Sequence, residues 1–374
     1  MSIPSNIFLN PACSHINAIV AALQQSTTLH LKQKRKYNLP KLIYRCLIMK
    51  KAMKILGYLL GSVVLLLAAC LTYFHFKGIP EYQYNPPAYV KNLKVQPDSV
   101  RVARGAKIAA MQCMACHAGP DGKLVGKPMN DVPAVFGELH TLNITRDSVH
   151  GIGAWTDGEL YYFLRTGIHN DGRWSPPFMP KYSLMADEDL YSVISWLRSD
   201  DPRLAPDSRE YPPNEFNLFV KVLANTLFGP SPFPEKPIML PDPTDKVASG
   251  KYVANALGDC YSCHSGDMLK INSLEPEKSF GYYGGGIPMR NEAGETVTSA
   301  NLTMDPETGI GNLTEQQFIE AVKYGKKPGG GMLSYPMLPH SMLTDDEVKS
   351  IHTYLKTVPV IKNPVQRYQA SVGN

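Results

Sequence analysis

The longest apolar stretch of the chain runs from Ile55 to Phe74, twenty residues without a charged side chain. A helix rises 1.5 Å per residue, so this stretch would span ~30 Å, the thickness of a bilayer's hydrocarbon core. Lys50, Lys51 and Lys54 precede it, and lysines gather at the cytoplasmic end of membrane helices. The pattern predicts one N-terminal transmembrane helix in a bacterial inner membrane, with the globular part in the periplasm.

Two other interpretations of this stretch remain open. Leu67-Ala68-Ala69-Cys70 has the form of a lipoprotein signal, in which Cys70 would be lipidated, and plain cleavage as a signal peptide is the second alternative. The apolar stretch continues beyond Cys70, which favours an uncleaved anchor. Residues 1–48 are an unusual preamble for an export signal, so we interpret them as an over-extended start and Met49 as the natural beginning.

Shorter amphipathic patterns in the remaining chain predict helices of eight to fifteen residues. Two of them carry capping-box patterns, Thr156-x-x-Glu159 and Thr314-x-x-Gln317, and each ends at a glycine eleven residues after its threonine. Three other expected helices cover residues 104–112, 214–228 and 250–257. Two more begin near Asp187 and at Thr344. The last two place Leu190, Ile194 and Leu197, or Val348, Ile351 and Leu355, on one buried face.

An internal repeat organises these patterns. A shift of 158 residues aligns residues 143–190 with residues 301–348 without a gap, and twelve of the 48 pairs are identical. The second copy has eleven more residues upstream of this block, which we assign to the glycine-rich loop around Gly281–Gly286. The chain therefore contains two related helical modules.

Charge is distributed unevenly along the chain. Residues 1–54 hold nine Lys or Arg and no Asp or Glu, whereas the whole chain has a net charge of +5, so the remaining 320 residues carry −4. The basic residues thus precede or flank the apolar stretch, and the globular part is mildly acidic. This distribution excludes a nucleic-acid-binding role.

Four of the seven cysteines form two Cys-x-x-Cys-His motifs, Cys113–His117 and Cys260–His264. Two thiols one helical turn apart can add to the two vinyl groups of one haem, and the adjacent histidine then ligates its iron. We therefore predict two covalently bound haem c groups, attached through Cys113 and Cys116 and through Cys260 and Cys263, with His117 and His264 as iron ligands. A dithiol redox motif or half of a zinc site would use the same cysteines, but no second cysteine pair lies near either motif.

The sequence from about Arg101 to Ile361 resembles tandem class I-type dihaem cytochromes c, in particular the cytochrome subunits of membrane-bound alcohol and sugar dehydrogenases. The resemblance rests on both Cys-x-x-Cys-His motifs, the Asn143-Ile144-Thr145 and Gly151–Thr156 segments, Phe178-Met179-Pro180 and their counterparts in the second copy. It implies a haem between the first and last helices of each module and a distal methionine from the loop before the last helix. Those subunits usually carry three haem modules, whereas this chain has two.

Met179 and Met337 are the predicted distal ligands because they occupy equivalent positions in the repeat. The rivals are Met185 and Met342, or His169 and His340, which would give bis-histidine haems of lower potential. Two further equivalent pairs, Asp147 with Asp305 and Arg165 with Lys323, are predicted to be turn and surface residues.

We expect an all-α protein with two cytochrome c-like modules behind one transmembrane helix. The expected parts are an extension (1–48), an anchor (49–77), a linker (78–100), cytochrome c domain 1 (101–200), a proline-rich connector (201–240), cytochrome c domain 2 (241–361) and a tail (362–374). An iron held by His and Met has no open position, so we predict an electron carrier between a periplasmic or membrane dehydrogenase and a downstream cytochrome or terminal oxidase, not an enzyme. A haem enzyme, such as a thiosulfate dehydrogenase or a dihaem peroxidase, and a haem-based sensor or assembly factor are the alternatives.

Overall fold

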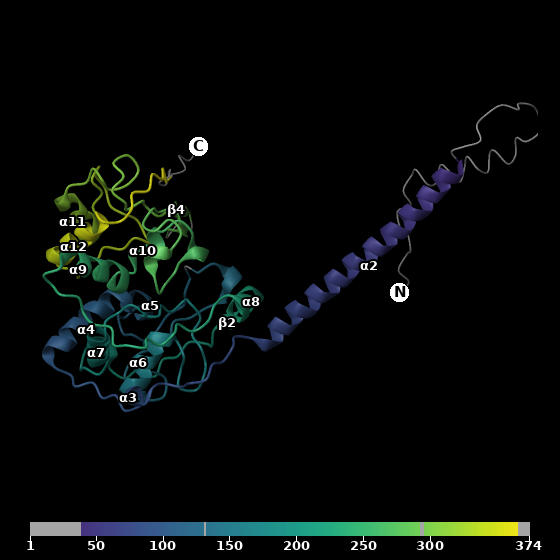
Figure 1. Cartoon of the computed structure of the whole chain (residues 1–374). Coiled ribbons are helices and arrows are strands. Elements are labelled where there is room, and N and C mark those ends of the chain that lie inside the picture. The colour runs from purple at the N-terminus through teal and green to yellow at the C-terminus, as the bar shows by residue number, and fades with distance from the viewer. Residues whose placement is uncertain (1–38, 131, 292–294, 366–374) are drawn as a thin grey trace, which may run out of the picture. The chain divides into compact units, whose positions relative to one another are not determined.

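The computed structural model describes residues 39–130, 132–291 and 295–365 (Figure 1). It divides into two units, Met1–Tyr73 and Phe74–Asn374. Most of the predicted extension and of the predicted tail lies outside the described residues. Among the described residues one helix, Leu47–Lys77, is long and apolar enough to cross a membrane by length and composition; it forms most of α2 (Leu39–Lys77).

The globular unit is mostly helical and has two halves, which we define as residues 78–240 and 241–365. The elements of the first half are α3 (Ala88–Lys91), α4 (Ser99–Gln112), α5 (Met114–His117), η1 (Ala134–Phe136), β1 (Gly137–Glu138), α6 (Asp157–Thr166), α7 (Asp187–Leu197), η2 (Pro202–Leu204), β2 (Glu215–Phe216) and α8 (Leu218–Thr226). Those of the second half are α9 (Lys246–Tyr252), η3 (Val253–Leu257), α10 (Cys260–His264), η4 (Met268–Lys270), η5 (Pro276–Lys278), β3 (Pro288–Arg290), β4 (Thr296–Thr298), α11 (Glu315–Tyr324) and α12 (Asp345–Leu355).

Each half is built around a crossed pair of helices, α4 with α7 and α9 with α12 (Figure 1). A glycine stands at each crossing, because a Cβ at Gly105 or at Gly250 would lie 1.9 Å from the carbonyl oxygen of Ser192 or of Ser350. The two serines are 158 residues apart, so the crossings are equivalent. The predicted apolar faces of α7 and α12 are buried against these partners.

The capping boxes predicted from sequence are confirmed. In α6 the Thr156 hydroxyl accepts from the Glu159 amide and the Glu159 carboxylate accepts from the Thr156 amide; α11 has the same exchange between Thr314 and Gln317. Both helices end at a glycine with positive φ, Gly167 and Gly325. The helix after Thr344 has a third capping box, formed by Thr344 and Glu347.

The helix before the second cysteine motif differs from the regular helix predicted over residues 250–257. Cys260 follows Gly250 by ten positions, whereas Cys113 follows Gly105 by eight. The additional residues are accommodated by the π-helical turn η3 and by Asp259, which adopts a left-handed conformation with φ 47°. A π-helical turn places one more residue in each turn, so the cysteines stay next to the helix crossing.

The structure corrects three further expectations. The predicted helix over 214–228 is shorter, because β2 occupies residues 215–216 and α8 begins at Leu218. The fold also has some strand, since β1 pairs antiparallel with β2 and β3 with β4. The eleven additional residues lie mainly upstream of the glycine-rich loop: Gly126 N donates to His117 O and Gly285 N to His264 O, so the longer segment is the one between His264 and Gly285, which holds η4 and η5.

Candidate functional site

Each Cys-x-x-Cys-His motif is a short helix that follows the crossing helix almost directly. In the first half Cys113 is the hinge between α4 and α5, and its amide still donates to Ala109 O in the preceding turn. In the second half α10 begins at Cys260 itself. The helical turn brings the two cysteines of each motif onto one side, as attachment to a single planar group requires.

The two motif histidines are buried and held in the same way. His117 Nδ1 lies 2.7 Å from Leu142 O, and His264 Nδ1 lies 2.8 Å from Ala300 O. A carbonyl oxygen only accepts, so Nδ1 carries the proton and the lone pair is on Nε2. This tautomer is the one that binds a metal through Nε2, and a second hydrogen bond of this kind is usual for metal-bound histidines. Burial also lowers the pKa of both imidazoles, which keeps them neutral.

An asparagine fixes the segment that supplies each of these carbonyls. Asn143 accepts from the Thr145 amide and donates to the carbonyls of Asp207 and Arg209. Asn301 accepts from the Thr303 amide and donates to Ile361 O. Asn143 and Asn301 directly follow Leu142 and Ala300, so these bonds hold the histidine acceptors in place.

The motif cysteines differ in exposure: Cys113 is buried, Cys116 and Cys260 are half-buried and Cys263 is exposed. Burial raises the pKa of Cys113 and of Cys260 to about 12 and also raises that of Cys263. The thiolate is the nucleophilic form of cysteine, and it is disfavoured here. The surroundings of Cys113 and Cys260 therefore disfavour dithiol redox chemistry.

The first methionine loop lies against the first motif. Met179 is half-buried against the core that contains Cys113, and the Tyr182 hydroxyl lies beside the Cys113 thiol. Lys181 Nζ donates to Pro176 O at 2.8 Å and to Met179 O at 2.6 Å. Burial lowers the pKa of this amine to about 7. Lys181 thus ties the loop into one conformation.

The second methionine loop has a similar path but no such tie. Met337 is half-buried. His340 corresponds to Tyr182 in the repeat, and its amide donates to Val322 O. Burial mainly lowers the pKa of His264, and the His340 imidazole adds to this effect, so this loop too lies near its motif. The residue equivalent to Lys181 is Pro339, which has no donor.

Among the rivals, Met185 is a fully buried core residue and Met342 is 47% exposed. His169 is buried, with its ring edge-on to Trp155 at 5.3 Å. The predicted turn residues Asp147 and Asp305 do accept from the backbone amides that follow them.

The prediction that Arg165 lies on the surface is wrong. Its side chain is fully buried, pairs with Asp187 at 2.5 Å and donates to the carbonyls of Tyr182 and Met185. Lys323 and Asp345 form the equivalent ion pair in the second half, also at 2.5 Å. This ion pair joins the capped helix of each half to the start of its last helix. In the sequence, it is indicated only by the fact that both of its members recur at the offset of 158 residues.

Several buried donors of the first half lack a hydrogen-bond partner among the described residues. They include Trp174 Nε1 and Arg146 Nε. Unpaired donors of this kind are costly, and the carboxylates of haem propionates accept such bonds. The residues around the first motif therefore fit a haem, with thiols, a histidine Nε2 and free donors on hand.

Residues 102–200 match the family model for cytochrome c. This segment contains the first motif, Met179 and the helices between them. It is a cytochrome c domain. A cytochrome c domain carries covalently bound haem c, so at least one such group follows from this match.

The chain is also homologous to cytochrome c subunits of dehydrogenases. It is 28% identical over 277 residues to the cytochrome c subunit of a quinone-dependent alcohol dehydrogenase of Gluconacetobacter polyoxogenes, covering 71% of this chain and 57% of the relative. It is 29% identical over 275 residues to the fructose dehydrogenase cytochrome subunit of Gluconobacter japonicus, covering 69% and 52%. A diheme cytochrome c-type protein of Cereibacter sphaeroides is 28% identical over 277 residues, covering 70% and 86%. The chain thus spans little more than half of the length of the dehydrogenase subunits.

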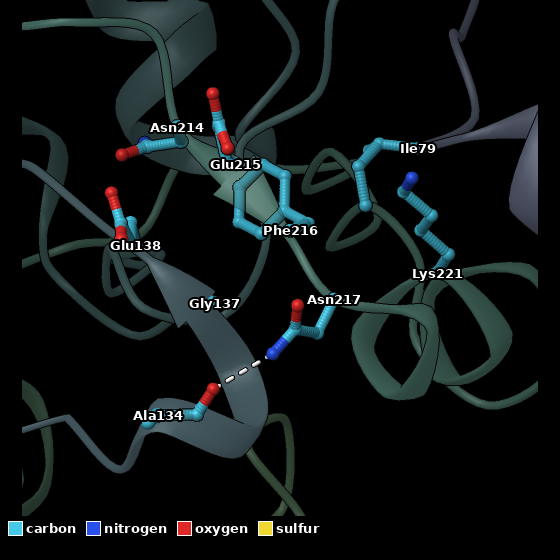
Figure 2. Close-up of a pocket in the computed structure, with 9 residues that line it drawn as sticks. All are labelled: Ile79, Ala134, Gly137, Glu138, Asn214, Glu215, Phe216, Asn217 and Lys221. Carbon is cyan, nitrogen blue, oxygen red and sulfur yellow. Dashed lines mark hydrogen bonds between the residues drawn. The ribbon is translucent and has the colours of Figure 1, made fainter.

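The pocket shown in Figure 2 is separate from the cytochrome c site residues. It is lined by Ile79, Ala134, Gly137, Glu138, Asn214, Glu215, Phe216, Asn217 and Lys221. The pocket lies over the β1–β2 pair, in which Glu138 stands opposite Glu215, and it contains neither a motif cysteine nor a predicted iron ligand. Two facing carboxylates suit neither an apolar ring nor its propionates.

Proposed function

We propose that the chain is a membrane-anchored dihaem c-type cytochrome. It carries electrons from a periplasmic or membrane dehydrogenase to a downstream cytochrome or terminal oxidase. The observation that carries the proposal is the matched geometry of the two motifs: each histidine donates Nδ1–H to the carbonyl directly before an equivalent asparagine. The second motif has the local structure that a haem ligand needs, although the family match covers only the first.

Coordination decides between transfer and catalysis. His117 and His264 would bind iron through Nε2, and Met179 and Met337 would bind it on the opposite face. When bound, haem c supplies reversible one-electron chemistry at its iron. Two protein ligands leave no position for a substrate, so the chain's own residues orient and insulate the group rather than act on a substrate.

The two motifs are close neighbours across the contact between the halves. The Gln112 side chain, directly before Cys113, donates to Leu257 O, three residues before Cys260. The pKa of Tyr182, beside Cys113, is raised mainly by burial and also by the charge of Asp259, directly before Cys260. This proximity supports a direct passage of electrons from one haem to the other.

The anchor and the partners form part of the same proposal. Leu47–Lys77 would hold the protein in the inner membrane, with both halves in the periplasm and without lipidation at Cys70. The similarity to cytochrome subunits of alcohol and fructose dehydrogenases supports a dehydrogenase as electron donor.

Haem counting and carbon monoxide binding test the proposal together. We expect two haems per chain in a pyridine haemochrome assay. The oxidised protein should show the weak absorption near ~700 nm that methionine-ligated Fe(III) gives, and the reduced protein should not bind carbon monoxide. One haem per chain would refute the second module. Carbon monoxide binding by the unmodified protein would instead support the haem-enzyme alternative.

A further inference from the structure

The methionine loop of the first half is covered by the linker that leads into it. Tyr82 N donates to Gly172 O at 2.8 Å, and the Tyr82 ring packs edge-on against Trp174 at 5.8 Å. Tyr84 packs against Tyr162 at 5.1 Å in the same way. As a result Trp174 and Tyr162 are buried.

The equivalent loop of the second half has the same internal hydrogen bonds. His169 N donates to Arg173 O and Gly172 N to His169 O; Lys327 N donates to Gly331 O and Gly330 N to Lys327 O. Each of these pairs matches its counterpart at an offset of 158 residues. The loop therefore has the shape that accepts an extended segment in the first half.

No segment covers this second loop within the part of the chain that the structure describes. Met332 takes the place of Trp174 and is 57% exposed, whereas Trp174 is 5% exposed. Gly330 O, the counterpart of Gly172 O, accepts no backbone hydrogen bond from a described residue. The same backbone shape thus presents its acceptor and its apolar side chains to solvent.

The exposed residues form one surface, which we call the docking face: Tyr324, Lys326, Lys327, Met332 and Leu338. They are contiguous, because a Cβ on Gly325 would lie 3.6 Å from Met332 Cε and 3.3 Å from Pro339, and because Lys326 and Met332 form a bridge. Lys326 lies 6.0 Å above the Tyr324 ring.

The docking face is basic although the globular part as a whole is acidic. Residues 321–344 contain three lysines and no acid. Lys323 pairs with Asp345, but no carboxylate of a described residue pairs with Lys326 or Lys327. Glu320, on α11, is the nearest acid before them in the sequence and lies where Tyr162 lies in the first half.

We propose that the docking face binds the redox partner of the second haem, an acidic redox protein that lays an extended apolar segment over the second methionine loop. The proposal rests on the function proposed above and adds to that function the place at which one partner binds. The linker of the first half shows the chemistry of the occupant: an extended backbone with an N–H for the glycine carbonyl, aromatic side chains, and an acidic residue, Glu81, that stays exposed. An acidic partner is favoured because Lys326 and Lys327 attract it and speed its encounter.

Lysines beside apolar side chains would also bind an anionic lipid surface. The carbonyl of Gly330 argues for a protein instead, because a backbone N–H satisfies its counterpart in the first half and a lipid headgroup supplies no such extended donor. Lipid binding is therefore an outcome that would overturn the proposal.

The test uses the full chain with both haems and reduced flavodoxin, an acidic redox protein, as electron donor. We expect Lys326→Glu combined with Lys327→Glu to lower the second-order rate constant about ten-fold or more at low ionic strength, and the difference to shrink at high salt. The matched control is Lys91→Glu with Lys94→Glu, two exposed lysines of the first half, which should change the rate little. Met332→Ser should weaken binding of flavodoxin, whereas Met239→Ser, at a site 78% exposed, should not.

An unchanged rate in the Lys326→Glu/Lys327→Glu variant, or an equal loss in the control, would overturn the proposal. So would a loss of binding to vesicles of phosphatidylglycerol and phosphatidylcholine without a loss of flavodoxin binding, or a loss of self-association in sedimentation. Haem counts separate this result from a failure of the proposed function. A chain with a single haem would refute the dihaem assignment, while calorimetric binding of flavodoxin would still report on the docking face.

Discussion

Both motif histidines are oriented by a backbone carbonyl, and the carbonyl is in turn held by an asparagine side chain. Asn143 and Asn301 make their bonds to segments more than fifty residues away in sequence. Loss of either amide would free the loop that carries the acceptor, although the asparagine does not touch the histidine. The position of the imidazole is thus set by two successive hydrogen bonds.

The distal ligands can be tested one residue at a time. We expect Met179→His to lower the potential of the first haem and Met337→His that of the second, because the soft, neutral thioether favours Fe(II) over Fe(III). Each shift should be on the order of 0.1 V or more, within the ~0.8 V that axial ligands span. Potentiometric titration followed in the visible spectrum measures both haems. A substitution that leaves both potentials and the ~700 nm absorption unchanged would show that the methionine is not a ligand.

Asp259 gives a prediction about pH. Burial raises the pKa of this carboxyl to about 6, above the value of an unfolded aspartate. The folded state therefore binds the proton more tightly than the unfolded state, and the resulting stabilisation is present at low pH and is lost as the pH rises through about 6. We expect Asp259→Asn, which cannot ionise, to remove this dependence and to raise Tm at pH 8 relative to the parent.

Thermal unfolding between pH 4.5 and pH 8 measures the effect. Asp267→Asn is the control, because its half-buried carboxylate pairs with Lys270, which lowers the pKa of that carboxylate, so its removal should act in the opposite direction. A parallel pH profile for the parent and Asp259→Asn would contradict the prediction.

At the residue scale the sequence revealed what covalent chemistry requires and little of what burial requires. The motif cysteines and histidines stand out in the sequence because haem attachment needs a fixed spacing, and their role as haem ligands stays a prediction. The burial of Arg165 and Lys181 could not be predicted, because a long basic side chain is normally exposed. Only the fold supplies the carbonyls that accept their hydrogen bonds, those of Tyr182, Met185, Pro176 and Met179.

At the element scale the capped helices were the most predictable part. Thr156-x-x-Glu159 and Thr314-x-x-Gln317 contain the whole cap within four residues, so no distant contact is needed. The π-helical turn η3 could not be predicted, because its cause is the crossing of Gly250 with Ser350, one hundred residues away. The strand pair β1–β2 is equally non-local, since residues 137–138 meet residues 215–216.

The cap of α12 allows a test of these local signals. We expect Thr344→Ala to lower the free energy of unfolding by about 1 kcal/mol, because the Glu347 amide loses its acceptor. Thr353→Ala, on the same helix, is the control; its hydroxyl bonds only to Lys349 O within the helix, and alanine is the better helix former. Urea unfolding followed by circular dichroism measures both. Equal destabilisation by the two changes would argue against a capping role.

At the scale of the whole molecule the two halves are held together by a small polar network. Asp189 is fully buried; Arg104 donates to both of its oxygens, and the Tyr252 hydroxyl of the second half donates to Asp189 Oδ2 at 2.5 Å. Lys107 of the first half bonds to both carboxylate oxygens of Glu347 in the second. The repeat and both Cys-x-x-Cys-His motifs can be found in the sequence, but this contact cannot, because no residue in it belongs to either motif.

The connector belongs structurally to the first half. Asn143 donates to the carbonyls of Asp207 and Arg209, and Ser231 N donates to Thr166 O. Phe233 stacks on Tyr162 at 5.5 Å. The domain boundary predicted at residue 200 would therefore remove contacts that the first motif needs.

This arrangement predicts how the chain can be divided. We expect residues 78–240 and residues 241–365, each exported alone, to bind one haem, because each retains its motif, its asparagine and its methionine loop. Residues 101–200 alone should bind haem poorly, because Asn143 then loses the acceptors that hold the Leu142 carbonyl against His117. Haem content per chain, measured after export with equal expression, ranks the three fragments.

The first fragment keeps the ion pair between Arg104 and Asp189, so losing the Tyr252 hydroxyl costs it a hydrogen bond but does not leave a buried charge alone. If residues 78–240 failed to hold haem while the full chain held two, the halves would form one interdependent core, and the electron path through Gln112 and Leu257 would lie inside that core rather than between separate modules.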